Sequence, residues 1–147
     1  MEKNRTAAVT LWANRAILVL LGVLVFAMPG MLSWYQGFRP LGLHGAAAVF
    51  FGFYLCVIPV GMALWRIEKL LRNILADRVF VADNVILIRR IRGCCLAVMA
   101  VCGIAGYFYQ PLLFLAIIMG FLSLMVSVMG HVMAAAVDIR EENDLTV

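Results

Sequence analysis

The stretch that decides the fold is residues 93–137, GCCLAVMAVCGIAGYFYQPLLFLAIIMGFLSLMVSVMGHVMAAAV, which contains no charged side chain. As one helix it would be about 68 Å long, more than twice the roughly 30 Å of a bilayer's hydrocarbon core. The chain must therefore reverse direction within it. Its polar interruption is Tyr109-Gln110-Pro111, and proline suits the first turn of a helix because it has no N–H to donate. We predict two membrane-spanning helices, about 93–108 and 112–137, joined by a turn.

Two further charge-free stretches precede this one. They hold 23 residues between Arg15 and Arg39, and 26 residues between Arg39 and Arg66. Since about 20 apolar residues suffice for one crossing, they predict spans at about 16–33 and 41–65. The fold class is an all-α integral membrane protein, one domain over residues 1–147, with four transmembrane helices packed as a bundle.

The composition supports a membrane protein. Hydrophobic residues make up 65% of the chain and charged residues 14%, with a mean hydropathy of +1.02. Soluble proteins average about 45–50% and 25% on comparable counts. These values exclude a soluble globule, a disordered chain, a disulfide-rich module and a domain that binds nucleic acid directly. The lipid bilayer is the first partner that they imply.

The basic residues predict the orientation. In the four-span arrangement Arg39 lies alone on one side, and eleven bases lie on the other: Lys3, Arg5, Arg15, Arg66, Lys69, Arg72, Arg78, Arg89, Arg90, Arg92 and Arg140. Lysine and arginine are enriched on the cytoplasmic side of membrane proteins. Both termini and the segment between the second and third helices are therefore expected in the cytoplasm.

That segment, residues 66–92, predicts a cytoplasmic helical hairpin. Its first half carries one apolar stripe at helical spacing, so the second helix should continue to about Leu75. The pattern breaks from Asp77 to Ala82, Asp83 is expected to cap the next helix, and Val85, Ile88 and Ile91 are expected to face inward. The stripe can either pack against the hairpin itself and the bilayer surface, or bind a partner.

The segment that follows the fourth helix, residues 138–147, is acidic. Carboxylates at a helix C-terminus oppose the helix macrodipole, so we expect them to pair with the basic end of the hairpin; the alternative is a solvated tail. Together the hairpin and the tail provide these candidate partner-binding residues: Asp83, Asn84, Arg89, Arg90, Arg92, Glu142, Asn143 and Asp144.

Residues that could perform chemistry are sparse. His44 and His131 are expected in opposite leaflets, roughly 15 Å apart in depth, so they cannot hold one metal ion. His131 is the candidate intramembrane polar residue. No catalytic or phosphate-binding motif is present. We expect no enzymatic activity, no metal and no cofactor. The small residues of the second and third helices fit either packing within the bundle or a homo-oligomer.

Two motifs resemble those of a known family. The segment Asp77–Ile91, DRVFVADNVILIRRI, resembles G-x-[VI]-F-[TV]-x-x-N-[VI]-x-x-[LI]-R-x-[IL], although Asp77-Arg78 stands where the family often has glycine and a small or basic residue. The end of the chain, EENDLTV, resembles E-x-[ED]-N-D-L-T-[VI]. Both are similar to the bacterial membrane family catalogued as domain of unknown function twenty-nine seventy-five. The resemblance implies a multi-pass protein of the bacterial inner (cytoplasmic) membrane, often encoded beside a small helix-turn-helix regulator.

The sequence therefore favours a non-enzymatic membrane protein that docks or modulates a cytoplasmic partner such as that regulator. One alternative is a small transporter or channel component that uses His131, Gln110, Ser123 and Ser127 as a polar pathway. Another is a structural subunit of a larger membrane complex.

Overall fold

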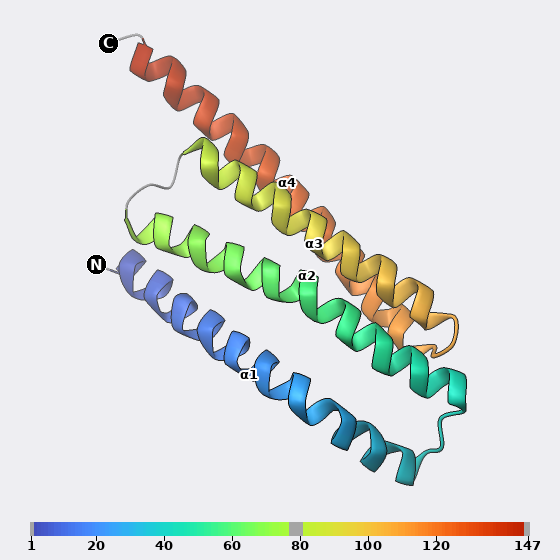
Figure 1. Ribbon diagram of the computed structural model, residues 1–147. Coiled ribbons are helices and arrows are strands. Elements are labelled where there is room, and N and C mark those ends of the chain that lie inside the picture. The colour runs from blue at the N-terminus through green and yellow to red at the C-terminus, as the bar shows by residue number, and fades with distance from the viewer. Residues whose placement is uncertain (1, 77–80, 146–147) are drawn as a thin grey trace.

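The computed structural model describes residues 2–76 and 81–145, and every regular element in them is an α-helix. The elements are α1 (Glu2–Phe38), α2 (Leu43–Leu75), α3 (Ala82–Gly106) and α4 (Pro111–Leu145). Consecutive helices run in opposite directions, so α1 and α3 begin, and α2 and α4 end, at the same end of the molecule (Figure 1). We call this end, where most charged residues lie, the charged end. The predicted all-helical fold with four helices is confirmed.

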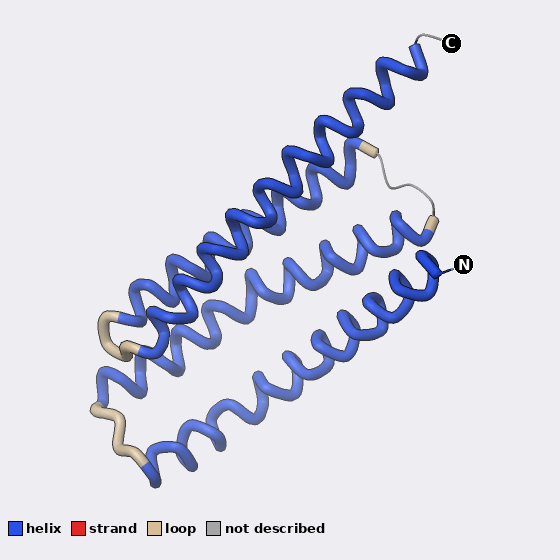
Figure 2. The backbone as a smooth tube through the Cα atoms, turned by 180° about the vertical axis from the view of Figure 1, so that it is seen from behind, coloured by secondary structure: helices blue, strands red, loops and turns tan. Residues whose placement is uncertain are grey.

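The helices form an open layer. Among the described residues, α1 packs against α2, α2 against α3, and α3 against α4, whereas no other pair of helices is in contact. The view from behind shows the same row (Figure 2). The helices therefore form a row and not the expected bundle, because the described parts of α1 and α4 do not meet.

Three helices are long and apolar enough to cross a membrane: Ala8–Phe38, Leu43–Leu75 and Pro111–Asn143. α3 differs because Asp83, Arg89, Arg90 and Arg92 occupy its first half. Its charge-free part, residues 93–106, is about 21 Å long, against roughly 30 Å of hydrocarbon. The charge-free part of α3 is therefore shorter than the hydrocarbon is thick, and α3 would cross the membrane only with the help of α2 and α4, which flank it. The fourth crossing stays a prediction.

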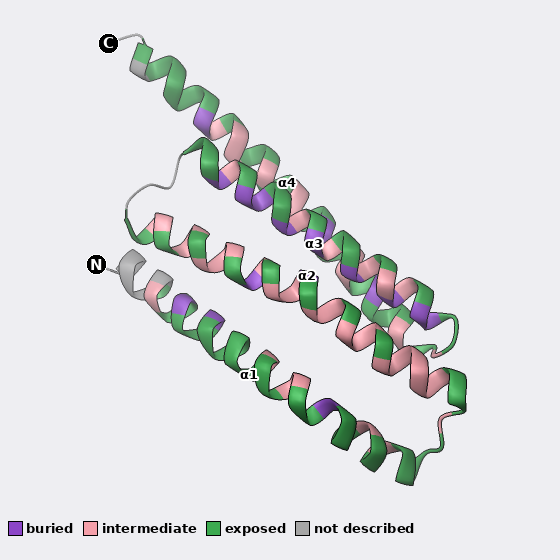
Figure 3. Cartoon of the chain, in the orientation of Figure 1, coloured by how far each residue is buried: buried purple, intermediate pink, exposed green. Residues whose placement is uncertain are grey.

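The core follows α3. Val98 and Cys102 of this helix form a buried cluster with Ala116 of α4, and Cys56 and Val60 of α2 pack against it. Figure 3 shows the buried positions concentrated on α3, while α1 is exposed over most of its length. The predicted inward positions are confirmed at Ile88 and Ile91, which are buried.

The predicted turn between residues 108 and 112 is confirmed. α3 ends at Gly106, and Pro111 is the first residue of α4, where its missing N–H costs nothing. A Cβ atom on Gly106 would lie 2.7 Å from Cγ of Leu113. Glycine at this position thus lets α4 return closely along α3.

The helices extend further than the predicted spans. α1 already begins at Glu2, and α2 ends at Leu75 as predicted. α3 begins at Ala82 with Val81 as its extended N-cap residue. The prediction that Asp83 caps this helix is therefore wrong. Asp83 lies in the first turn, where its negative charge interacts favourably with the helix dipole. Residues 77–80, where the pattern breaks, and residues 146–147 of the tail motif lie outside the described residues.

Candidate functional site

The charged end joins α1 to α2 through one carboxylate. Glu68 of α2 accepts hydrogen bonds from Nε and a terminal nitrogen of Arg15, at 3.2 and 3.1 Å, and from Arg72 at 2.7 Å. The hydrogen bonds from Arg72 and Arg15 hold the pKa of the Glu68 carboxyl below its usual range. One turn earlier on α2, the carbonyl oxygen of Leu64 accepts a hydrogen bond of 3.1 Å from the amide of Asn14, a buried residue of α1. These contacts hold the beginning of α1 against the end of α2.

The predicted binding residue Asn84 is part of the core. Its side chain is fully buried, and its Oδ1 accepts a hydrogen bond of 2.7 Å from Nδ2 of Asn73. This contact joins the last turns of α2 to the first turn of α3. Asn84 is therefore unavailable to a partner while these helices are packed together, whereas its neighbour Asp83 is exposed.

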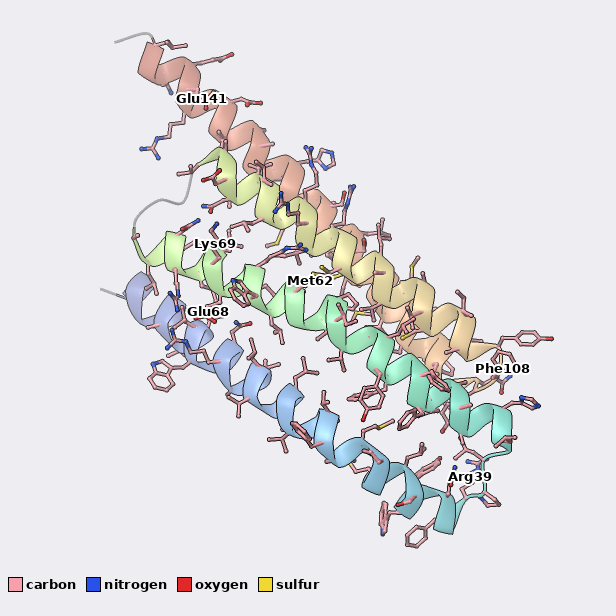
Figure 4. All side chains as sticks on the ribbon, viewed as in Figure 1. Arg39, Met62, Glu68, Lys69, Phe108 and Glu141 are labelled. Carbon is pink, nitrogen blue, oxygen red and sulfur yellow. The ribbon has the colours of Figure 1, made fainter. Side chains whose placement is uncertain are left out.

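A cavity of about 500 Å³ lies between α2 and α3, and we call it the α2–α3 groove. Its charged part contains Arg66, Lys69 and Arg90, and its remaining lining residues are Val57, Ile58, Gly61, Met62, Trp65 and Leu87. A terminal nitrogen of Arg66 donates to the carbonyl oxygen of Arg90 at 3.2 Å and to Sγ of Cys94 at 3.0 Å. Figure 4 labels Met62 and Lys69 of this groove, and Glu68, which contacts α1 instead.

A second cavity, of about 310 Å³, lies between α3 and α4, and we call it the α3–α4 groove. Arg89, Arg92, Ser127 and His131 line it. Arg92 donates to Oγ of Ser127 at 3.1 Å, and Nδ1 of His131 lies 2.8 Å from the carbonyl oxygen of Ser127. Since a carbonyl oxygen can only accept, Nδ1 carries the hydrogen in this contact. The predicted arginines thus lie on two grooves, with Arg90 in the α2–α3 groove and Arg89 and Arg92 in the α3–α4 groove.

The acidic tail is the last part of α4. Val137 is buried, and the described side chains after it are exposed, among them Glu141, Glu142 and Asn143. α4 carries this segment past the beginning of α3 (Figures 1 and 4). Glu141 lies about 21 Å along the helix from Ser127, the residue that Arg92 contacts, so Glu141 does not pair with Arg92. The wider pairing of the tail with the basic end of the hairpin stays a prediction. The side chain of Asp144 lies outside the described residues.

The opposite end of the layer holds the other histidine. His44 is exposed, its ring stacks on Phe108 with centroids 6.4 Å apart, and it lines a cavity of about 690 Å³ formed by the two connections at that end. The two histidines therefore lie toward opposite ends of the molecule. Gln110 and His131, the first and last members of the proposed polar pathway, are about 31 Å apart along the chain's helical axis.

The arrangement offers cations to an anionic ligand and carboxylates to a basic one. Within the described segments, no three His, Cys, Asp or Glu side chains gather as they would around a metal ion. Sequence reasoning missed the α2–α3 groove, although a signal was present. Ile58, Met62, Trp65 and Lys69 recur at helical spacing on α2, which places an apolar stripe directly before a basic residue.

Comparison with known proteins gives one match. The family described as Protein of unknown function (DUF2975) matches residues 3–147, which is almost the whole chain. No curated protein and no solved structure matches the chain.

Proposed function

Since this chain belongs to the DUF2975 family, whose description names no activity, we propose a function from the chain's own geometry. It is a non-enzymatic protein of the bacterial cytoplasmic membrane that docks a cytoplasmic partner at the free end of α4. The observation that carries the proposal is the exposed, acidic end of this helix, beyond the last buried residue Val137. Both termini and the connection from α2 to α3 face the cytoplasm in this arrangement.

The described side chains at the end of α4 are exposed, so little packing among the described residues stabilises this segment. It is about eight residues long, and an isolated helix of this length is marginal in water. Ile139 and Leu145 are 61% and 88% exposed, so most of the surface of two large apolar side chains is left uncovered within the described structure. Contact with a second protein would bury them.

The negative charge of the segment indicates a partner with a basic surface. The sequence of the segment contains four acids, Asp138, Glu141, Glu142 and Asp144, and one base, Arg140. Carboxylates at this helix end oppose the macrodipole. A basic protein surface would offset that cost. The small helix-turn-helix regulator suggested by the resemblance fits, because DNA-binding domains present a basic face to phosphates. Docking on α4 would then compete with DNA for the same face.

The test is capture of the regulator by the full-length chain in lipid nanodiscs. We expect the combined change Asp138→Asn, Glu141→Gln and Glu142→Gln to abolish capture, and higher salt to weaken capture by the unchanged protein. DNA containing the regulator's binding site should release it. Capture that survives the triple substitution would refute docking at this helix end.

Arg140→Gln is the matched control. It alters the same exposed segment but removes the opposite charge, so capture should stay equal or become stronger. Equal losses in Arg140→Gln and in the triple variant would mean that the shape of the helix end, and not its charge, is recognised.

The alternatives have less support. A transporter or channel needs an enclosed polar pathway, which an open layer would form only with further copies. A structural subunit would use the exposed apolar faces of α1 and α4, but a lipid bilayer covers such faces equally well.

A further inference from the structure

We propose that the α2–α3 groove binds an anionic phospholipid. The phosphate lies at Arg66, Lys69 and Arg90, and an acyl chain lies along Val57, Ile58 and Met62. The proposal is independent of docking at α4, because the groove is formed by other helices.

No described carboxylate neutralises the cations of the groove. In the parts of the chain that the structure describes, Glu68 pairs with Arg15 and Arg72, and no carboxylate pairs with Arg66, Lys69 or Arg90. Arg66 has five N–H groups, and its hydrogen bonds to Arg90 and Cys94 come from one terminal nitrogen. The N–H groups on its other two nitrogens remain for a ligand. These bonds also hold the Arg66 guanidinium in place before the ligand arrives.

The length of the groove and the position of its basic residues fit an amphiphile. Along α2 it runs from Val57 to Lys69, about 18 Å, and its basic residues lie at one end. One leaflet of a bilayer contains about 15 Å of hydrocarbon, so the groove covers one acyl chain and the phosphate above it. Ile58 and Met62 are 66% and 45% exposed, which leaves the apolar part open to lipid.

Trp65 marks the depth of the phosphate. It is 73% exposed and directly precedes Arg66, at the end of the charge-free part of α2. Tryptophan is enriched at the boundary between hydrocarbon and headgroups, and basic pockets between helices at the cytoplasmic boundary bind anionic headgroups. A free phosphate ion would leave the apolar half of the groove unused, so the geometry favours the lipid.

Quenching of Trp65 fluorescence tests the proposal. The full-length chain carrying Trp12→Phe and Trp34→Phe retains Trp65 as its single tryptophan, and brominated lipids quench a tryptophan that they contact. In vesicles of phosphatidylcholine, we expect a small fraction of brominated phosphatidylglycerol to quench more strongly than the same fraction of brominated phosphatidylcholine. Equal quenching by the two lipids would overturn the proposal.

Neighbouring arginines on α3 provide the matched comparison. Arg90→Gln changes the α2–α3 groove, and Arg89→Gln removes the same charge from the α3–α4 groove. The preference for phosphatidylglycerol should fall about fivefold in Arg90→Gln and stay nearly unchanged in Arg89→Gln. Equal decreases would show general attraction to a charged surface and would contradict a site. Lys69→Gln, at an exposed position, provides a second variant that leaves the packing intact and should also lower the preference.

Competition with inorganic phosphate distinguishes a phospholipid headgroup from a free phosphate ion as the bound anion. In detergent micelles containing brominated phosphatidylglycerol, phosphate should not relieve the quenching more than chloride at equal ionic strength. Relief by phosphate alone would assign the groove to a free anion and would overturn its assignment to a lipid.

Discussion

The hydroxyl of Tyr54 on α2 donates to the carbonyl oxygen of Val25 on α1 at 3.0 Å. Val25 lies four residues before Pro29, which is inside α1 and has no N–H to donate to that oxygen. Unsatisfied backbone groups are costly in a membrane, and neighbouring side chains commonly satisfy those freed by proline. The tyrosine thus compensates for the proline across a helix interface.

A double-mutant cycle tests this compensation. Tyr54→Phe should destabilise the protein by about 1 kcal/mol, measured as unfolding in mixed micelles. In the Pro29→Ala background residue 29 supplies the missing N–H, so the same substitution should cost much less. An equal cost of Tyr54→Phe in both backgrounds would contradict the account.

Asn84 gives the second prediction at this scale. Asn84→Ala leaves the Nδ2 group of Asn73 without its acceptor and should lower stability by about 2 kcal/mol. The loss should be smaller in an Asn73→Ala background. Partner capture by Asn84→Ala should persist below its unfolding temperature. If capture disappears while the unfolding temperature stays unchanged, Asn84 is a docking residue and its buried contact is unimportant.

At the scale of elements, Glu68 connects α1 to α2 and should make their association depend on pH. Its pKa is lowered in the folded protein, so its contribution is present at neutral pH and is lost as the pH falls through the folded-state pKa. Glu68→Gln should therefore lower the unfolding temperature at neutral pH, and this difference should shrink as the pH falls through the folded-state pKa of Glu68. Glu141→Gln, on the exposed end of α4, is the control. A difference for Glu68→Gln that persists at acid pH would contradict this role.

Helix positions were more predictable than helix ends. The charge-free stretches predicted four helices, and Pro111 predicted the turn between α3 and α4, because hydrocarbon length and the missing proline N–H act locally. The continuation of α1 to Glu2 and of α4 to Leu145 was not predicted. Charges exclude a segment from the membrane, but they do not end a helix. The helical spacing of residues on α2 indicates one wall of the α2–α3 groove. Which helix packs beside that wall, and which residue contacts Asn84, depends on packing that periodicity does not reveal.

At the scale of the whole molecule, the layer separates membrane anchoring from binding at one end. Its apolar length suits a bilayer, and its charged end collects the grooves and the free end of α4. Among the described helices, α1 packs against α2 alone and α4 packs against α3 alone, so both outer helices keep exposed apolar faces. The arrangement suits a protein that is anchored in lipid and works at one surface.

That account requires an even number of crossings, and α3 is the helix that decides it. Topology reporters fused before Met1 and after Val147 measure this directly. With α3 crossing between α2 and α4, both reporters should indicate the cytoplasm, where the basic residues favour the charged end. A cytoplasmic N-terminal reporter with an external C-terminal one would mean three crossings, and it would contradict both the shared cytoplasmic end and docking at α4.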